Sequence, residues 1–426
     1  MDDTVTPGTA LRQLRLAQGA GLRELARDMC CDPGHLSRME SGVRPLSLEC
    51  AQMADRCLDT GGALTALVRA SYGQRGYDGQ AEPTGGLLII EVATPEGEIV
   101  VPVPRRDVFM ALGIGASSML PDLHRTTVAP EAVGELDKAL EGFRIAARAM
   151  PPAQLLDALT GRVAVISAMR RKASPEIAAR LAITQARYAE FVSWMHEEAG
   201  NLTQAVWWVD RAGEWAHASR WAPMVAFTSV RKSVIATMHT ADAHRTVDLA
   251  QIALHTDGAT PAVQRFAAGQ LAYGHALASD LAASRRALNL ASSYYQKAAV
   301  QPEDELSIGA QSVLDHDPVE LNWAACNVFA GYGEPAIDVL SPRMNALKGA
   351  SPRAYAIHGA RLVHAYALAG HPDEVCRTFA EVLDTTAVTE SATARRELGR
   401  IRPVLTSRWP RRSDLRDIAH RLTVLA

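Results

Sequence analysis

Aromatic residues and unbalanced charge are both scarce in this sequence. Phe, Trp and Tyr make up 5% of the 426 residues, and the formal net charge at pH 7 is -3. A chain this close to neutral does not coat nucleic acid or bind acidic membranes through its bulk charge. Any contact with DNA must therefore come from a local group of basic side chains.

The cysteines lack the spacing of a metal site. The six of them include no CxxC pair, and no segment brings four metal ligands together. This usage is typical of reduced thiols in a cytoplasmic protein. The residues are Cys30, Cys31, Cys50, Cys57, Cys326 and Cys376.

Long apolar runs are also missing. The first residues, MDDTVTPGTA, are acidic and lack the apolar core of a signal peptide, and no uncharged apolar stretch of about 18 residues occurs. The pair Arg105 and Arg106 resembles a twin-arginine export signal, but it lies mid-chain behind a folded segment, so we reject export. We expect a cytoplasmic protein with no membrane partner.

Catalytic motifs are absent as well. The sequence has no GxxxxGK(S/T), GxSxG or GxGxxG element. The MHEEAG segment begins like a zinc-protease helix, yet Gly200 stands where the second His would be. We therefore predict no catalytic residue, no metal, no cofactor and no enzymatic activity.

What the sequence does contain is a helical pattern near its N-terminus. Apolar residues recur at the spacing of one helix face over Leu22–Met29. Asp32 can then accept from the free amides of a new helix, and Pro33 suits its first position. Ser41-Gly42 ends this third helix, and Ser47 caps a fourth one.

The segments LRELA, PGHLSRME and ESG resemble the Xre-type, phage-repressor-like helix-turn-helix family. The resemblance implies that the third helix enters the major groove of operator DNA. It also implies that Arg15 pairs with Glu40 to stabilise the fold. Two positions depart from the family, because Cys30 stands where a left-handed glycine is usual and Gly21 where Ser or Thr caps the second helix.

Carried over residue by residue, the resemblance places the DNA contacts on and beside the third helix. Pro33 and Gly34 offer no side-chain donor, so Arg38 should carry most of the base readout, bidentate to a guanine. An ordinary helical bundle, or a head that no longer binds DNA, is the alternative. The other expected contacts are His35 and Ser37 near the bases, and Arg23, Arg27 and Arg44 at phosphates.

Residues 73–106 change in composition. The Gly-rich stretch YGQRGYDGQAEPTGG is followed by two β-branched runs, LLIIEVA and IVVPVP, around a Pro/Gly turn. This pattern predicts a linker with one β-hairpin. A single hairpin is marginal alone, so it should pack on the helical body or on a partner subunit.

From Pro130 onward, short breaks recur at intervals of about 40 residues, with one longer gap, between Ala-rich helical segments. The clearest unit, ARYAEFVSWMHEEAGNLTQAVWWVDRAGEWAHAS, resembles a tetratricopeptide repeat. The resemblance implies stacked helix pairs with a concave binding surface. The breaks lie at 200–201, 241–242, 279–280, 331–333, 370–371 and 409–410.

Five polar or aromatic residues on the expected first helices of these repeats are candidates to line that surface. Arg and Asn there could bind a peptide backbone or an anionic group. Exposed polar residues that bind nothing are the alternative. The five are Tyr188, Arg231, Tyr273, Asn322 and Arg361.

Together these patterns predict a mainly α protein. It has a helix-turn-helix domain of four or five helices at 1–72, the linker with its β-hairpin at 73–106, and an α-solenoid of tetratricopeptide-like helix pairs at 107–426. We expect a transcriptional regulator that binds double-stranded operator DNA as a homodimer and senses a peptide or small-molecule effector. The rival is a protein-interaction scaffold that carries the head as a tether or a constitutive DNA binder.

Overall fold

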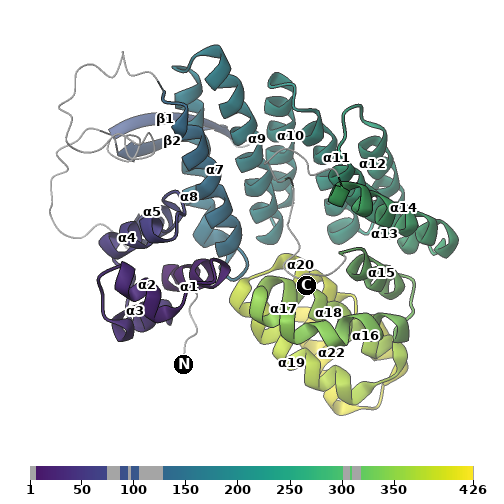
Figure 1. The fold of residues 1–426 in the computed structure, drawn as a ribbon. Coiled ribbons are helices and arrows are strands. Elements are labelled where there is room, and N and C mark those ends of the chain that lie inside the picture. Colours follow the sequence, from purple (N-terminus) through teal and green to yellow (C-terminus); the bar gives the residue numbers. More distant parts are fainter. Residues whose placement is uncertain are drawn as a thin grey trace, which may run out of the picture. The chain divides into compact units, whose positions relative to one another are not determined.

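The computed structural model describes residues 6–73, 87–94, 97–104, 128–300, 308 and 318–425. These parts are mainly helical (Figure 1). The Gly-rich stretch from 74 to 86 and the pair Arg105 and Arg106 lie outside the described residues. No helix in the described ranges combines the length and apolar character needed to cross a membrane.

The chain divides into two compact units. The first consists of Met1–His196 and Thr203–Arg220, and the second of Glu197–Leu202 and Trp221–Ala426. The N-terminal head therefore belongs to the same unit as the long helices that begin at Glu131. The first two of these are α7 (Glu131–Ala146) and α8 (Pro152–Arg170).

Five helices form the head within residues 6–73. Its core contains Leu11, Leu14, Leu25, Leu36 and Met39, and none of these side chains is more than 2% exposed. They are the apolar positions that recur at helical spacing, so the pattern in the sequence accounts for this core. The helices are α1 (Pro7–Ala17), α2 (Leu22–Asp28), α3 (Pro33–Glu40), α4 (Leu48–Cys57) and α5 (Ala63–Gly73).

The predicted helix caps are present. The Asp32 carboxylate accepts the backbone N–H of His35 at 3.0 Å, and the Ser47 hydroxyl accepts that of Cys50 at 3.2 Å. Pro33 is the first residue of α3, where its missing N–H costs no hydrogen bond. These local signals set where α3 and α4 begin.

A two-stranded antiparallel sheet follows the head in sequence. Its strands are β1 (Leu87–Thr94) and β2 (Gly97–Pro104), with Leu87 opposite Pro104 and Thr94 opposite Gly97. Both strands lie beside α8 in the first unit (Figure 1).

The head packs directly on α7. At Gly61, where φ is +57°, a Cβ would lie 2.4 Å from the carbonyl oxygen of Glu135 and 2.6 Å from the amide nitrogen of Ala139. Across the same contact, a Cβ on Gly142 would lie 2.6 Å from the Cβ of Ala63. Glycine on both sides therefore permits the close approach of the turn between α4 and α5 to α7.

Polar contacts add to this packing between the head and the helices behind it. The Lys138 ammonium lies 2.9 Å from the Asp59 carboxylate, and this hydrogen bond raises the pKa of Lys138. Arg162 of α8 donates to the carbonyl oxygen of Gly62 at 3.4 Å. The α4–α5 turn is thus held by both α7 and α8.

The helix α9 (Pro175–Glu198) is joined to α7 by a buried cation. Arg187, which is 2% exposed, donates to Asp137 at 2.7 Å and to Glu141 at 3.0 Å. A buried guanidinium needs such partners, because an unpaired charge in the interior is costly. The next helix is α10 (Leu202–Ala218).

The second unit is a row of helix pairs. Helix α11 packs on α12, α13 on α14, α15 on α16, and α18 on α19, while α11 also contacts α13, α13 contacts α15, and α15 contacts α18. Such contacts between successive first helices are the pattern of a helical solenoid. The helices are α11 (Ala222–Ile235), α12 (Ala243–His255), α13 (Pro261–Leu277), α14 (Leu281–Val300), α15 (Pro318–Phe329), α16 (Glu334–Leu340), α17 (Met344–Ala350), α18 (Pro352–Ala369), α19 (Pro372–Thr389), α20 (Ala392–Gly399), α21 (Arg402–Arg408) and α22 (Ser413–Leu425).

The predicted breaks coincide with turns between helices. A left-handed residue follows the first helix of each of five pairs, which lets the chain reverse direction within a few residues. The sixth break, at 409–410, falls between α21 and α22. The left-handed residues are Gly200 (φ 82°), Ala241 (φ 51°), Ser279 (φ 62°), Gly331 (φ 88°) and Gly370 (φ 93°).

Candidate nucleic-acid interface

Helix α3 has one buried face and one polar exposed face. Leu36 and Met39 point into the head and are at most 1% exposed. Ser37 and Arg38 are exposed on the other face. The remaining residues predicted to contact DNA on this helix are partly exposed, and they are Pro33, Gly34 and His35.

A buried ion pair attaches the end of α3 to α1, as the family resemblance implies. The Arg15 guanidinium donates to both carboxylate oxygens of Glu40, at 2.6 and 2.8 Å, and to the carbonyl oxygen of Ala20 at 2.9 Å. The hydrogen bond from Arg15 to Glu40 raises the pKa of Arg15. This bidentate geometry restricts both side chains, so it orients α3 against the rest of the head.

The turn before α3 is left-handed at Cys30, where φ is +50°. The amide of Cys30 donates to the carbonyl of Arg27 at 3.0 Å, and that of Cys31 to the carbonyl of Ala26 at 2.8 Å. A residue with a Cβ therefore occupies the left-handed position, two residues after the last residue of α2, where the family usually has glycine.

Three further arginines that the sequence assigns to phosphates are exposed: Arg23, Arg27 and Arg44. Arg27 lies 3.9 Å from the carboxylate of Asp28, and both side chains are mostly exposed. An exposed pair of this kind contributes little to stability and leaves the cation available to a partner.

A buried carboxylate that sequence reasoning missed organises the other end of the head. Asp55 of α4 accepts the backbone N–H groups of Leu64 and Thr65 at 2.9 Å each. The hydroxyl of Thr60 also donates to it. Asp55 therefore satisfies the free amides at the start of α5, a role that Ser or Thr usually plays from the position just before a helix.

Tyr188, predicted to line a ligand surface, lies in the core of the first unit. Its ring is fully buried, and its hydroxyl donates to the carbonyl oxygen of Leu136 at 2.8 Å. Burial raises the pKa of this phenol above its ordinary value. In this structure Tyr188 joins α9 to α7.

Three of the other predicted ligand residues lie in the second unit near one another. The hydroxyl of Tyr273 donates to the side-chain oxygen of Asn322 at 2.7 Å. The positive charge of Arg361 interacts electrostatically with the same Tyr273 hydroxyl. Arg361 is 5% exposed and lies 3.3 Å from the Glu397 carboxylate. Its charge is thus paired inside the protein, and ligand binding by these residues stays a prediction.

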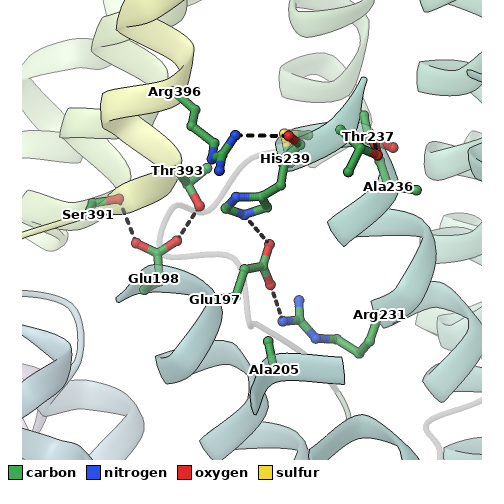
Figure 2. A network of polar contacts seen from close by, with 12 residues as sticks. Glu197, Glu198, Ala205, Arg231, Ala236, Thr237, His239, Ser391, Thr393 and Arg396 are labelled. Carbon is green, nitrogen blue, oxygen red and sulfur yellow. Dashed lines mark hydrogen bonds and ion pairs between the residues drawn. The ribbon is translucent and has the colours of Figure 1, made fainter. Parts of the chain in front are cut away.

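Arg231, the last of the five, is part of a buried polar network (Figure 2). It forms an ion pair with Glu197, whose other carboxylate oxygen lies 3.2 Å from Nε2 of His239. Burial tends to raise the pKa of Glu197, but Arg231 and His239 outweigh it and hold that pKa below its usual range. Glu197 is thus a carboxylate anion, and its charge is balanced inside the fold by its ion pair with Arg231.

The neighbouring carboxylate, Glu198, is shared by three donors from the C-terminal helices. It accepts the guanidinium of Arg353 at 2.8 Å. It also accepts the hydroxyls of Ser391 at 2.5 Å and Thr393 at 2.6 Å (Figure 2). The side chain is 1% exposed, so these bonds replace its hydration.

Two arginines of the C-terminal part bind the short π-helix η1 (Ala236–Thr240), which carries His239. Arg396 donates to the carbonyl oxygen of His239 at 2.9 Å, and Arg400 to that of Thr237 at 2.8 Å. The carbonyl groups at the end of a helix lack hydrogen-bond donors within the helix, and these two guanidinium groups donate the missing hydrogen bonds.

A capped helix with an exposed arginine, a left-handed turn before it and a buried ion pair behind it define a helix-turn-helix domain. Residues 8–68 match the family model described as a helix-turn-helix domain. The match covers the N-terminal head. No curated protein matches the chain. Among the residues that the structure describes, no group of His, Cys, Asp and Glu is arranged to bind a metal ion.

Proposed function

We propose that this protein is a sequence-specific transcriptional regulator whose helix α3 reads operator DNA in the major groove. The observation that carries the proposal is Arg38, which is exposed on α3 within the segment that matches the helix-turn-helix family. A guanidinium at this place can donate two hydrogen bonds to one guanine. The exposed charges of Arg23, Arg27 and Arg44 supply phosphate contacts that position the helix.

The packing of the head on α7 supports control of DNA binding by the rest of the chain. The α4–α5 turn approaches the α7 backbone at Gly61 and is bonded to Lys138 through Asp59. A head packed in this way moves together with α7, whereas a head on a free tether would not. This contact favours a regulator over a scaffold that carries the head as a tether.

The proposal includes a cytoplasmic homodimer and a peptide or small-molecule effector that binds the helix-pair unit. Two heads of a dimer reach successive major grooves about 34 Å apart. An effector that binds one arrangement of the helices more tightly would change the fraction of dimers whose two heads have the spacing of the operator. Sedimentation equilibrium of the whole protein tests the dimer, and a monomer would contradict it. Titration of the operator in the presence of host extract tests the effector, and an operator affinity that the extract does not change would contradict it.

The Arg38→Ala variant tests the reading residue. Fluorescence anisotropy with the promoter region beside the gene should show a loss of about 1 to 3 kcal/mol in binding free energy and a relaxed preference at one base pair. Arg180→Ala is the matched control, because Arg180 is an exposed arginine on α9. Wild-type affinity and sequence preference in Arg38→Ala would refute the assignment.

A further inference from the structure

Val43 is the most exposed large apolar side chain in the part of the chain that the structure describes. Its exposed fraction is 76%, compared with 56% for Ile252 and 50% for Leu16. A single exposed apolar residue is common on protein surfaces and means little by itself. Its position relative to α3 is what makes Val43 informative.

The turn that carries Val43 folds back on α3. The amide of Gly42, where φ is +76°, donates to the carbonyl of Met39 at 3.2 Å, and that of Arg44 donates to the carbonyl of Arg38 at 2.9 Å. Leu46, which is 4% exposed, anchors the far side of the turn in the core. Val43 is therefore held on an ordered turn beside the backbone of the predicted reading residue.

Arg44 follows Val43 in the chain and is exposed, yet Val43 itself can make only apolar contacts. Arg38 is also exposed, and its guanidinium extends toward Gly34 at the start of α3. A surface that met only phosphate groups would gain nothing from a β-branched apolar side chain. The apolar group that the major groove presents is the C5-methyl of thymine.

We infer that Val43 reads the methyl group of one thymine of the operator, at the end of α3 from which the turn emerges. This inference rests on the proposed DNA-binding function and adds a second residue that determines its sequence preference. Burying one methyl group contributes roughly a fourfold change in affinity. Val43 therefore discriminates thymine from the other bases at a single operator position.

Replacement of thymine by deoxyuridine tests the inference, because uracil differs from thymine only in lacking this methyl group. An operator is first obtained by selecting random DNA on the whole protein, and each thymine is then replaced in turn. Wild-type protein should bind one such operator about fourfold more weakly. In Val43→Ala, thymine and uracil at that position should bind equally well.

Two further variants complete the experiment. Val43→Ile retains the apolar contact and should retain the uracil penalty, while Ile252→Ala removes a comparably exposed β-branched side chain from α12 and should leave the penalty unchanged. A uracil penalty of the same size in Val43→Ala, or no penalty at any thymine in the wild type, would overturn the inference. Failure of the whole protein to select any sequence would instead overturn the proposed function.

Discussion

Cys30 occupies a left-handed backbone conformation that costs a residue with a Cβ about 1 kcal/mol relative to glycine. Two hydrogen bonds across the turn, from the amides of Cys30 and Cys31, hold the chain in this conformation. The turn sets the angle between α2 and α3. The strained conformation of Cys30 is therefore part of what orients the reading helix α3. The buried pair of Arg15 and Glu40 acts on the other end of α3.

Cys30→Gly should relieve this strain. We expect the free energy of unfolding to rise by about 0.5 to 1 kcal/mol, measured by urea denaturation of the whole protein. Cys57→Gly is the matched control, because Cys57 is also an exposed cysteine but ends helix α4, where glycine is unfavourable. The control should lower stability, and a loss of stability in Cys30→Gly as well would contradict the strain argument.

At the scale of helices and turns, the sequence predicts whatever depends on residues a few positions apart. The cap at Asp32, the inward residues Leu36 and Met39 and the turn at Gly370 are all local, and the structure has each of them. The pair of Arg15 and Glu40 spans 25 residues, and it was predicted only because the family resemblance supplied it.

Contacts between distant helices were not predictable in the same way. Arg231 finds its carboxylate partner 34 residues away and Arg361 finds one 36 residues away. A helix inside a row of pairs contacts neighbours on more than one side, so its polar residues can face either a groove or another helix. The hydrophobic period does not distinguish these two outcomes, because it reports burial and not the partner.

Gly61→Ala tests the contact between the head and α7. The new Cβ would lie 2.4 Å from a backbone oxygen of α7, so we expect the head to separate from α7 and their amides to exchange faster. Gly19→Ala is the matched control, since φ is +67° there and a Cβ would meet nothing within 4 Å.

Hydrogen exchange followed by mass spectrometry should show faster exchange in α7 for Gly61→Ala and unchanged exchange for Gly19→Ala. Both variants carry the strain of a left-handed alanine, so any difference between them reports the steric contact. Equal exchange in α7 for the two variants would show that the head does not depend on this contact.

At the scale of the whole molecule, polar contacts between residues far apart in sequence join the first residues of the second unit to its C-terminal helices. Glu198 binds Arg353, Ser391 and Thr393 across 155, 193 and 195 residues. Loss of one member of a buried ion pair is strongly destabilising, because the other charge stays buried without a partner. The C-terminal helices and the end of α9 should therefore unfold together.

Two buried histidines make the stability of this unit depend on pH. Burial lowers the pKa of His358 to about 3, and burial likewise lowers that of His364 to about 4. Both lie well below the ordinary histidine value of 6.5. As the pH falls below that value, the unfolded chain takes up protons at these residues while the folded chain keeps both rings neutral, so stability decreases.

Denaturant unfolding should show this loss between about pH 7 and about pH 5, with roughly 2 kcal/mol contributed by each histidine. His358→Gln combined with His364→Gln should remove most of the difference in unfolding free energy between these two pH values. His420→Gln is the control, because His420 is exposed on α22 and should leave the pH dependence as in the wild type. An unchanged pH dependence in the double variant would mean that other groups determine it.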